Sequence, residues 1–133
     1  MTDTTGFGEN AAEAAIQNVI SGGATVHLLG GGDTAAYGDS GADIDTKSDA
    51  SQAVAEADWT INTPADFSGV ATLENDNEID FGEQDIGTVD DIVIQNDADG
   101  DVWVLADEPD NPDLTGEDVS IPAGTTIYSL GNP

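Results

Sequence analysis

The stretch DDIVIQNDADGDVWVLAD, residues 90–107, decides the fold because it predicts a hairpin of two antiparallel strands. Ile92 and Ile94 follow a two-residue period toward the turn, which is typical of a strand. Asp99 and Gly100 tolerate the positive φ angles that a tight hairpin turn requires. The apolar run from Val102 to Leu105 then leads back, and we interpret it as a central strand that is buried on both faces.

Further strand-like segments flank this hairpin, at residues 24–29, 57–62, 69–75 and 78–83. Turn residues separate them at short spacings, which favours an antiparallel arrangement over alternating strands and helices. The closing stretch VSIPAGTTIYSL, residues 119–130, predicts two short strands joined at a Pro-Ala-Gly step. The sequence therefore predicts a mainly β protein, an antiparallel β-sandwich of jelly-roll-like type.

One short N-terminal helix is predicted near residues 10–21. Asn10 is the expected N-cap, Glu13 completes a capping box, and Gly22 with Gly23 ends the helix. An apolar stripe along one face is formed by Ala12, Ile16, Val19 and Ile20. We expect this stripe to pack the helix on the sheet.

The remaining segments complete the predicted organisation. Residues 1–8 are small and polar and predict a flexible or extended arm, and residues 9–133 predict a single β-sandwich domain. Residues 30–51 are rich in Gly, Asp and Ser without periodicity, so we expect a long surface loop. Residues 51–58 fit a short helix or a strand before the alternation of Trp59 and Ile61 begins.

The charge of the chain is its most unusual property. Asp and Glu together number 28, Lys47 is the one basic side chain, and the net charge is −27. Multimolar salt shortens the Debye length to about 3 Å or less, so carboxylates repel each other weakly there. At low ionic strength the same surface destabilises the compact state. The composition therefore indicates a halophilic organism or a virus of one.

The same charge excludes several classes of partner. Nucleic-acid binding depends on Lys and Arg side chains that contact phosphates, and anionic membranes are equally unfavourable for this chain.

No apolar run reaches the roughly 20 residues of a membrane-spanning helix, and the first residues lack the pattern of a secretory signal. Cysteine is absent, which excludes disulfides and thiolate metal sites.

The sequence predicts no catalytic, cofactor-binding or metal-ligating residue. Asp97, Asp99 and Asp101 alternate, but the glycine falls one place early for a calcium loop and no Glu closes it. The acidic stretch 107–118 is expected to be a solvated loop, and residues 30–34 lack the Lys and spacing of a phosphate loop. His27 is the single histidine, and we interpret it as an edge or partly buried residue of a sheet.

Trp59 and Trp103 are the remaining candidates for a binding role. Either ring could serve as a platform on which a sugar stacks, but both occupy strand patterns, which favours a position in the core.

The order of elements resembles that of small virion proteins of tailed viruses, the head-fibre and tail-fibre proteins. The likeness includes a leading helix, a strand before a Gly/Asp-rich loop, Trp59, the Asp99-Gly100 hairpin and the closing Pro122-Ala123-Gly124 step. A Gly-Tyr-x-Arg segment that is frequent in such proteins has no counterpart here. The resemblance implies a β-sandwich with one packed helix that assembles on a virion, with no catalytic residues to carry over.

These observations lead to two hypotheses of function. The first is a non-enzymatic virion structural protein of a haloarchaeal tailed virus, a capsid decoration, turret or tail-associated component. We expect it to contact other capsid or tail proteins and copies of itself, as a trimer or pentamer on a capsid. We expect those contacts to use the edge of the helix stripe, residues 24–29 or the terminal strand. The alternative is a carbohydrate- or cell-surface-binding β-module of a halophile, with Trp59 or Trp103 exposed.

The charge imbalance predicts that the fold depends on salt. The Debye length grows from about 3 Å at 1 M salt to about 30 Å at 0.01 M, so dialysis to low salt strengthens repulsion among the carboxylates. We expect a clear fall in the thermal unfolding midpoint, measured by circular dichroism across this range. Equal midpoints at both extremes would contradict the prediction.

Overall fold

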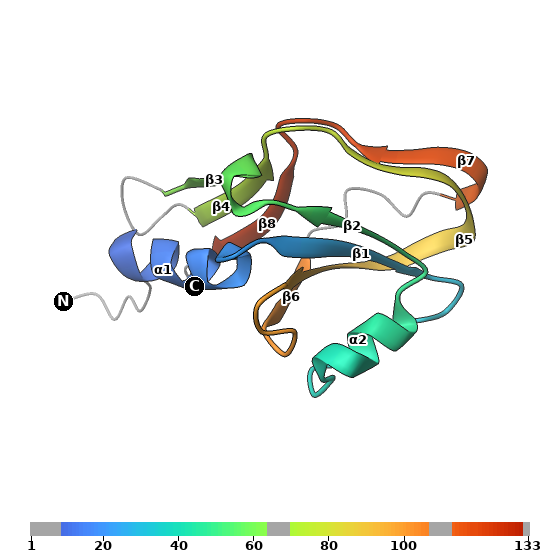
Figure 1. The fold of residues 1–133 in the computed structure, drawn as a ribbon, viewed down its shortest axis with the longest axis horizontal. Coiled ribbons are helices and arrows are strands. Elements are labelled where there is room, and N and C mark those ends of the chain that lie inside the picture. Colours follow the sequence, from blue (N-terminus) through green and yellow to red (C-terminus); the bar gives the residue numbers. More distant parts are fainter. Residues whose placement is uncertain (1–8, 64–69, 107–112, 132–133) are drawn as a thin grey trace.

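The computed structural model describes residues 9–63, 70–106 and 113–131. They form two sheets of antiparallel strands and two α-helices (Figure 1). This arrangement confirms the predicted mainly β fold, a β-sandwich with a short N-terminal helix. No helix among the described residues is long and apolar enough to cross a membrane.

The larger sheet has five strands, in the order β2-β1-β5-β6, and β7 pairs with a separate part of β5. The bounds of these strands are Ala24–Gly30 (β1), Ala50–Val54 (β2), Ile79–Asn96 (β5), Trp103–Ala106 (β6) and Asp113–Ile121 (β7). Because β1 lies between β2 and β5, residues 24–29 are at the centre of this sheet and not at its edge.

The smaller sheet has three strands in the order β3-β4-β8. They span Trp59–Asn62 (β3), Val70–Asn75 (β4) and Thr126–Gly131 (β8), and a 3-10 turn at Glu56–Asp58 precedes β3. The two predicted terminal strands are therefore both present, but they do not pair with each other. Strand β7 pairs with β5 in the larger sheet, and β8 pairs with β4 in the smaller one.

Strand β5 connects the parts of the fold. Its 18 residues pair with β7 over the first half and with β1 and β6 over the second half. Gly82 and Gly87 adopt positive φ angles of 73° and 79°, and the pairing with β7 shifts register near both. The strand can therefore bend and serve two ladders, as the long ribbon at the upper right of Figure 1 shows.

The end of β5 is buried on both faces. Ile92 and Ile94 belong to the main core, whereas Val93 forms a small second core with Leu29 and Ile44 on the opposite face. Residues 92–96 are all buried. The doubly buried strand of the hairpin is thus β5 and not its partner.

The interpretation of Val102–Leu105 as a central strand is wrong. Strand β6 begins at Trp103 and lies at the edge of the sheet, with Leu105 50% exposed and Val104 only partly buried. A continuous apolar run indicates burial on both faces only when strands flank it on both sides, and β6 has a strand partner on one side alone.

The predicted hairpin of residues 90–107 is confirmed for its described residues, but its turn differs. Ile94 pairs with Val104 and Gln95 with Trp103. Neither Asp99 nor Gly100 has a positive φ, because the turn is longer than two residues and is closed by backbone bonds of 2.8 and 3.0 Å on either side of Val102.

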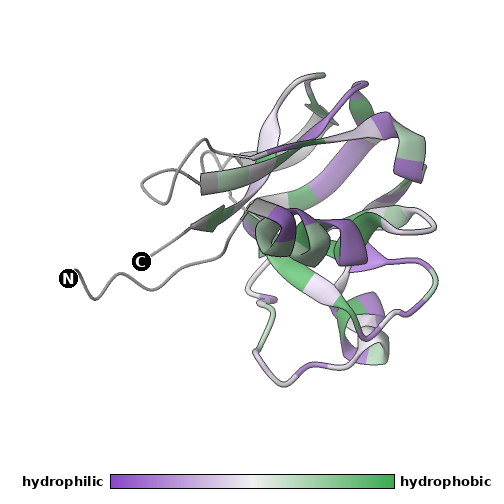
Figure 2. Cartoon of the chain, turned by 90° about the vertical axis from the view of Figure 1, so that its left-hand side faces the viewer, coloured by the Kyte–Doolittle hydropathy of each residue, from purple (hydrophilic) through white to green (hydrophobic). Residues whose placement is uncertain are grey.

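Helix α1 spans Glu9–Ile20 and packs through the predicted stripe. The four residues of this stripe are at most 4% exposed and belong to the main core. Figure 2 shows the helix against the sheets, with hydrophobic and hydrophilic residues alternating along it. Gly22 and Gly23 end it with φ angles of 84° and 99°, as predicted. Asn10 is not the N-cap, because the helix already includes Glu9.

Helix α2, Gly41–Lys47, was not predicted and corrects the interpretation of residues 30–51 as a loop throughout. Ser40 and Asp43 form a capping box at its start. Ile44 is fully buried and packs in the second core. A single buried side chain gives no periodicity, so only the Ser40-x-x-Asp43 spacing could have indicated this helix.

Two buried asparagines join separate elements. The Asn96 amide donates to the carbonyls of Asn18, Val19 and Ser21 at the end of α1, and its Oδ1 accepts from two backbone N–H groups of the hairpin turn. Asn75 contacts the turn between β7 and β8 in the same way, through Ile121, Pro122 and Thr125. Each side chain satisfies backbone groups that would otherwise be buried without partners.

Replacing Asn96 tests this role. Asn96→Ala removes five hydrogen bonds at a site that is 4% exposed. We expect it to lower the free energy of unfolding by about 2–3 kcal/mol, since buried carbonyls lose their donors. Denaturant unfolding at constant molar salt measures this, with the exposed Asn62→Ala as matched control. Equal midpoints for the two variants would show that Asn96 has no such role.

Candidate functional site

Strands β6 and β8 form a seam between the two sheets. Each is the last strand of its own sheet, and the two lie in contact without pairing as a ladder. Neither carries an acidic residue, although the net charge of the chain is −27. The two strands of the seam are therefore uncharged within a very acidic molecule.

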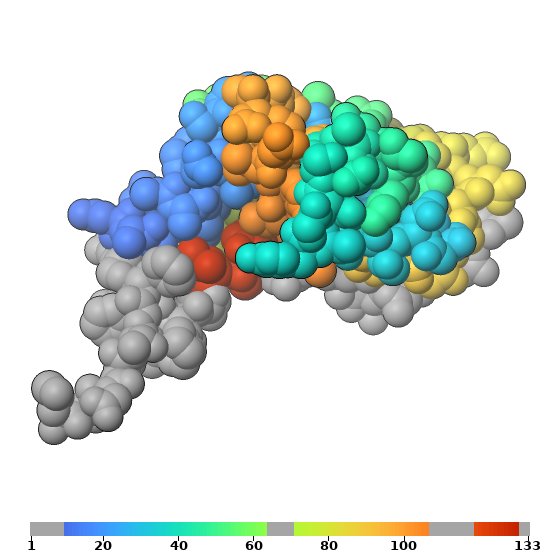
Figure 3. Space-filling view, turned by 90° about the horizontal axis from the view of Figure 1, so that it is seen from below, coloured from blue at the N-terminus to red at the C-terminus, as the bar shows by residue number. Residues whose placement is uncertain are grey.

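An open hollow of about 680 Å³ lies at this seam. Its lining comes from the loop before α2, from β6 and the turn that precedes it, and from β8. The lining residues are Ala35, Tyr37, Asp39, Asp101, Trp103, Val104, Leu105 and Tyr128. Figure 3 shows these segments together on one face, in teal, orange and red.

Exposed hydrophobic side chains are concentrated at this hollow. Tyr37 and Leu105 are the two large hydrophobic residues that are exposed among the described residues, at 105% and 50%, and both line it. Isolated exposed hydrophobics are ordinary, but a concave group of them marks an interaction site. We therefore take the hollow as the candidate binding site.

Trp103 is held firmly at the site. Its side chain packs against the second core, and its indole Nε1 donates to the Asp39 carbonyl at 2.9 Å. The side chain remains only partly buried and lines the hollow. Of the two tryptophans, Trp59 meets the expectation of a core residue, at 7% exposed, whereas Trp103 does not.

The loop before α2 is ordered by carboxylates that accept backbone N–H groups. Such bonds of 2.8 Å join Gly32 to Asp90 and Ala35 to Asp91, so the loop is fixed to β5. Charge-assisted bonds of this kind are stronger than neutral ones. They place Tyr37 and Asp39 beside β6 without any basic residue from the sheet.

Asp39 also forms the ion pair of the site. Its Oδ2 lies 2.7 Å from the Lys47 ammonium and 2.8 Å from the Ala36 N–H. The hydrogen bond from Lys47, together with that from Ala36, lowers the pKa of the Asp39 carboxyl below its ordinary value of 3.8. Asp39 therefore stays ionised in moderately acidic solution.

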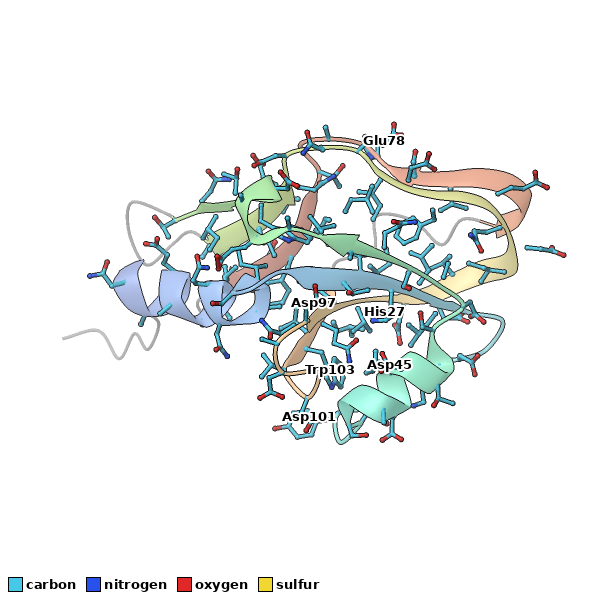
Figure 4. All side chains as sticks on the ribbon, in the orientation of Figure 1. His27, Asp45, Glu78, Asp97, Asp101 and Trp103 are labelled. Carbon is cyan, nitrogen blue, oxygen red and sulfur yellow. The ribbon has the colours of Figure 1, made fainter. Side chains whose placement is uncertain are left out.

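Asp101 provides a second carboxylate from the hairpin turn. Its Oδ1 accepts the Gly41 N–H at 2.8 Å, which fixes the turn to the start of α2. A Cβ atom on Gly41 would clash with the Gly100 carbonyl, so glycine is needed for this approach. Figure 4 shows Asp101 near Trp103, next to the left-hand end of α2.

His27 has a structural role next to this region. It is 5% exposed on the central strand β1, more buried than the predicted edge residue. Its Nε2 lies 2.7 Å from Gln95 Oε1, and the Gln95 amide donates to Gly41 and Gly100. Because a carbonyl oxygen can only accept, His27 Nε2 donates in its contact with Gln95 Oε1.

The remaining contacts of His27 lead to α2. Its Nδ1 lies 2.7 Å from the Ser48 hydroxyl, and Asp45 lies 3.9 Å from Nε2. Figure 4 shows His27 and Asp45 facing each other, with Glu78 on the far side of the molecule. The network fastens α2 and the hairpin turn to the sheet.

The acids of the hairpin turn do not converge. Asp97 accepts from Thr25, Asp99 accepts from the Asp101 N–H, and Asp101 accepts from Gly41. Within residues 9–63, 70–106 and 113–131, no group of three acidic or histidine side chains could hold a metal ion. Residues 107–112 of the predicted acidic loop lie outside the described residues, whereas residues 113–118 belong to strand β7.

Tyr37, Leu105 and Tyr128 were not singled out as site residues by their sequence context. For Tyr37 a signal existed, since an aromatic residue in a Gly/Asp-rich loop has no strand pattern that would bury it. For the other two, only the edge positions of β6 and β8 give the exposure.

No protein-family model, curated protein or solved structure shows significant similarity to this chain. The function of the hollow must therefore be inferred from its own geometry and charge.

The lowered pKa of Asp39 gives a testable titration. The pKa of Asp39 is lower in the folded protein than in the unfolded chain. The Asp39–Lys47 pair therefore stabilises the fold at pH values above the ordinary pKa, and this stabilisation is lost as the pH falls through the lowered pKa. We expect Lys47→Met to raise the Asp39 titration midpoint in carboxyl NMR spectra, and Lys47→Arg to keep it low. Identical midpoints in all three proteins would exclude Lys47 as the cause.

Proposed function

We propose that the protein is a non-enzymatic contact protein that binds another surface through the seam of β6 and β8. One observation carries this proposal: both exposed large hydrophobic side chains of the described residues line a single hollow. The strands around it have no acids in a chain of net charge −27. Concave apolar surfaces with a few polar groups are typical binding sites.

For the setting we propose the virion of a haloarchaeal tailed virus, where the protein is a capsid decoration, turret or tail-associated component. The order of elements that resembles head-fibre and tail-fibre proteins supports this setting, as does the charge. A β-sandwich with a packed helix agrees with what that resemblance implies.

Self-assembly is part of the proposal, and the fold reduces the number of surfaces through which copies could contact each other. The helix stripe and residues 24–29 are buried in the core, which leaves the terminal strand among the surfaces expected from the sequence. Strand β2 offers a further edge: it is uncharged, its central residues are exposed, and it lies at the opposite end of the sheet from β6. Contacts between copies through β2 would leave the hollow free.

The second candidate is a carbohydrate- or cell-surface-binding β-module of a halophile. The partly exposed ring of Trp103 favours it specifically, since this hypothesis requires an accessible tryptophan. The two candidates differ in where the protein works and agree on the surface that it uses.

Particle composition and oligomeric state test the virion proposal. We expect mass spectrometry to find the protein in purified virus particles, and light scattering in molar salt to show a closed oligomer. Ala53→Asp, in the exposed centre of β2, is expected to reduce the oligomer to monomers, since like charges would meet across the contact. Asn62→Asp, on an exposed residue of β3, is the matched control.

A protein that is absent from particles and strictly monomeric would refute the virion proposal. The surface-binding module would then replace it. An oligomer that survives Ala53→Asp unchanged would exclude β2 as the contact between copies.

A further inference from the structure

We propose that the hollow at the seam binds a neutral pyranose sugar, with Trp103 as the stacking platform. This inference rests on the proposed contact function and names the chemical class of its ligand. Binding of such a sugar requires an aromatic ring that is held in place and hydrogen-bond acceptors in fixed positions. A preference for a neutral ligand also requires charges that disfavour a charged one. Described residues provide each of these features.

The aromatic face is fixed before any ligand arrives. Trp103 packs on the second core and its Nε1 is bonded to the Asp39 carbonyl, so the ring is held in one orientation. Tyr37 and Tyr128 line the same hollow. The C–H groups on one side of a pyranose ring carry partial positive charge and pack on the negative face of an aromatic ring. A platform that is already ordered loses little entropy on binding.

The polar groups are acceptors in fixed positions. Asp39 is anchored through Oδ2, and Asp101 is anchored through Oδ1. These anchoring bonds hold both carboxylates in place beside the hollow that they line. Sugar hydroxyls donate hydrogen bonds, and their bonds to carboxylates are charge-assisted. The lining of the hollow thus combines aromatic side chains with carboxylates, which suits a sugar with one apolar face and a hydroxyl edge.

Charge excludes anionic ligands. Asp39 and Asp101 both line the hollow, and Lys47 is committed to Asp39 and to the Thr34 carbonyl at 3.0 Å. A phosphate, a sulfate or a uronic acid would meet carboxylates without a free cation. The ligand is therefore neutral or cationic.

Salt distinguishes the two remaining classes. In multimolar salt, inorganic cations are present at molar concentration and compete with an organic cation for the two carboxylates. Stacking of C–H groups on an aromatic ring is not weakened by screening, and excluded salts strengthen apolar burial. A neutral sugar therefore fits the conditions that the charge of the chain indicates.

The size of the hollow agrees with a small saccharide. Its volume of about 680 Å³ falls within the roughly 300–1,000 Å³ of small-molecule sites. The hollow is open to solvent, and Tyr37, which lines it, is fully exposed. It can therefore take a terminal residue or a short segment of a surface glycan.

The test uses the full chain in 3 M KCl with defined probes. The probes are methyl glucoside, mannoside and galactoside and their neutral oligosaccharides, with glucuronate and tetramethylammonium as charged controls. Binding is followed by tryptophan fluorescence and by calorimetry. We expect saturable binding of at least one neutral sugar and none of glucuronate.

The variants separate binding from folding. Tyr37→Ala changes a fully exposed side chain and is expected to weaken sugar binding by about five- to tenfold, as loss of one stacking partner does. Trp103→Ala is expected to abolish binding, and Trp103→Phe to restore part of it. Asn62→Ala, on an exposed residue of β3 outside the hollow, is the control that leaves binding unchanged.

The outcomes distinguish the sugar from the contact function. Binding of tetramethylammonium without any neutral sugar would assign the hollow to an organic cation and overturn the proposal. Failure of all probes, with attachment to halophilic cells still weakened by Tyr37→Ala, would leave the contact function and refute the sugar. Failure of all probes with attachment unaffected by Tyr37→Ala would refute both.

Discussion

The fold depends on burying both faces of one strand, the second half of β5. Ile92 and Ile94 face the main core with α1 and the smaller sheet, and Val93 faces the second core under α2. The same strand pairs with β1, β6 and, beyond its bend, β7. Every other element pairs with β5, covers one of its faces, or packs on an element that does so. Asn96, the last residue of β5, also joins this strand to α1 and to the hairpin turn. Its side chain donates to the last carbonyls of α1 and accepts from N–H groups of the turn.

The acidic composition changes how the surface is built around that strand. Because Lys47 is the single basic side chain, its pair with Asp39 is the one Lys–carboxylate ion pair open to the loops. Carboxylates accept backbone N–H groups instead, as in the pairs Gly30–Asp49, Gly32–Asp90 and Ala35–Asp91. Such bonds join two groups within the chain and require no counter-charge, so they remain effective where salt screens long-range attraction. They explain how a stretch without hydrophobic periodicity acquires a defined course and presents Tyr37 at the seam.

Hydrophobic period made the sandwich, the β5–β6 hairpin and helix α1 predictable, because Ile16, Ile92 and Ile94 repeat at the spacing of the structure that buries them. The period failed where burial depends on neighbours from elsewhere in the chain. Val102–Leu105 looks like a central strand, but the order of the sheet places β6 at an edge. Helix α2 has Ile44 as its one buried large side chain, which is too little for a periodic signal. The hollow was unpredictable for the same reason, since it arises only where edges from two different sheets meet.

The position of the hollow follows from the way the sandwich ends. Two sheets with different partners meet at β6 and β8 without a ladder between them, so apolar side chains there cannot be fully covered. Trp103, Leu105 and Tyr128 line the hollow together with Asp39 and Asp101, and each of the two carboxylates is anchored by a backbone N–H. The site therefore combines aromatic and aliphatic side chains with acceptors that are held in place. Recognition by stacking and by short hydrogen bonds is then the mode that high salt weakens least, which is why we assign the seam to a neutral, hydroxyl-rich ligand and not to a charged one.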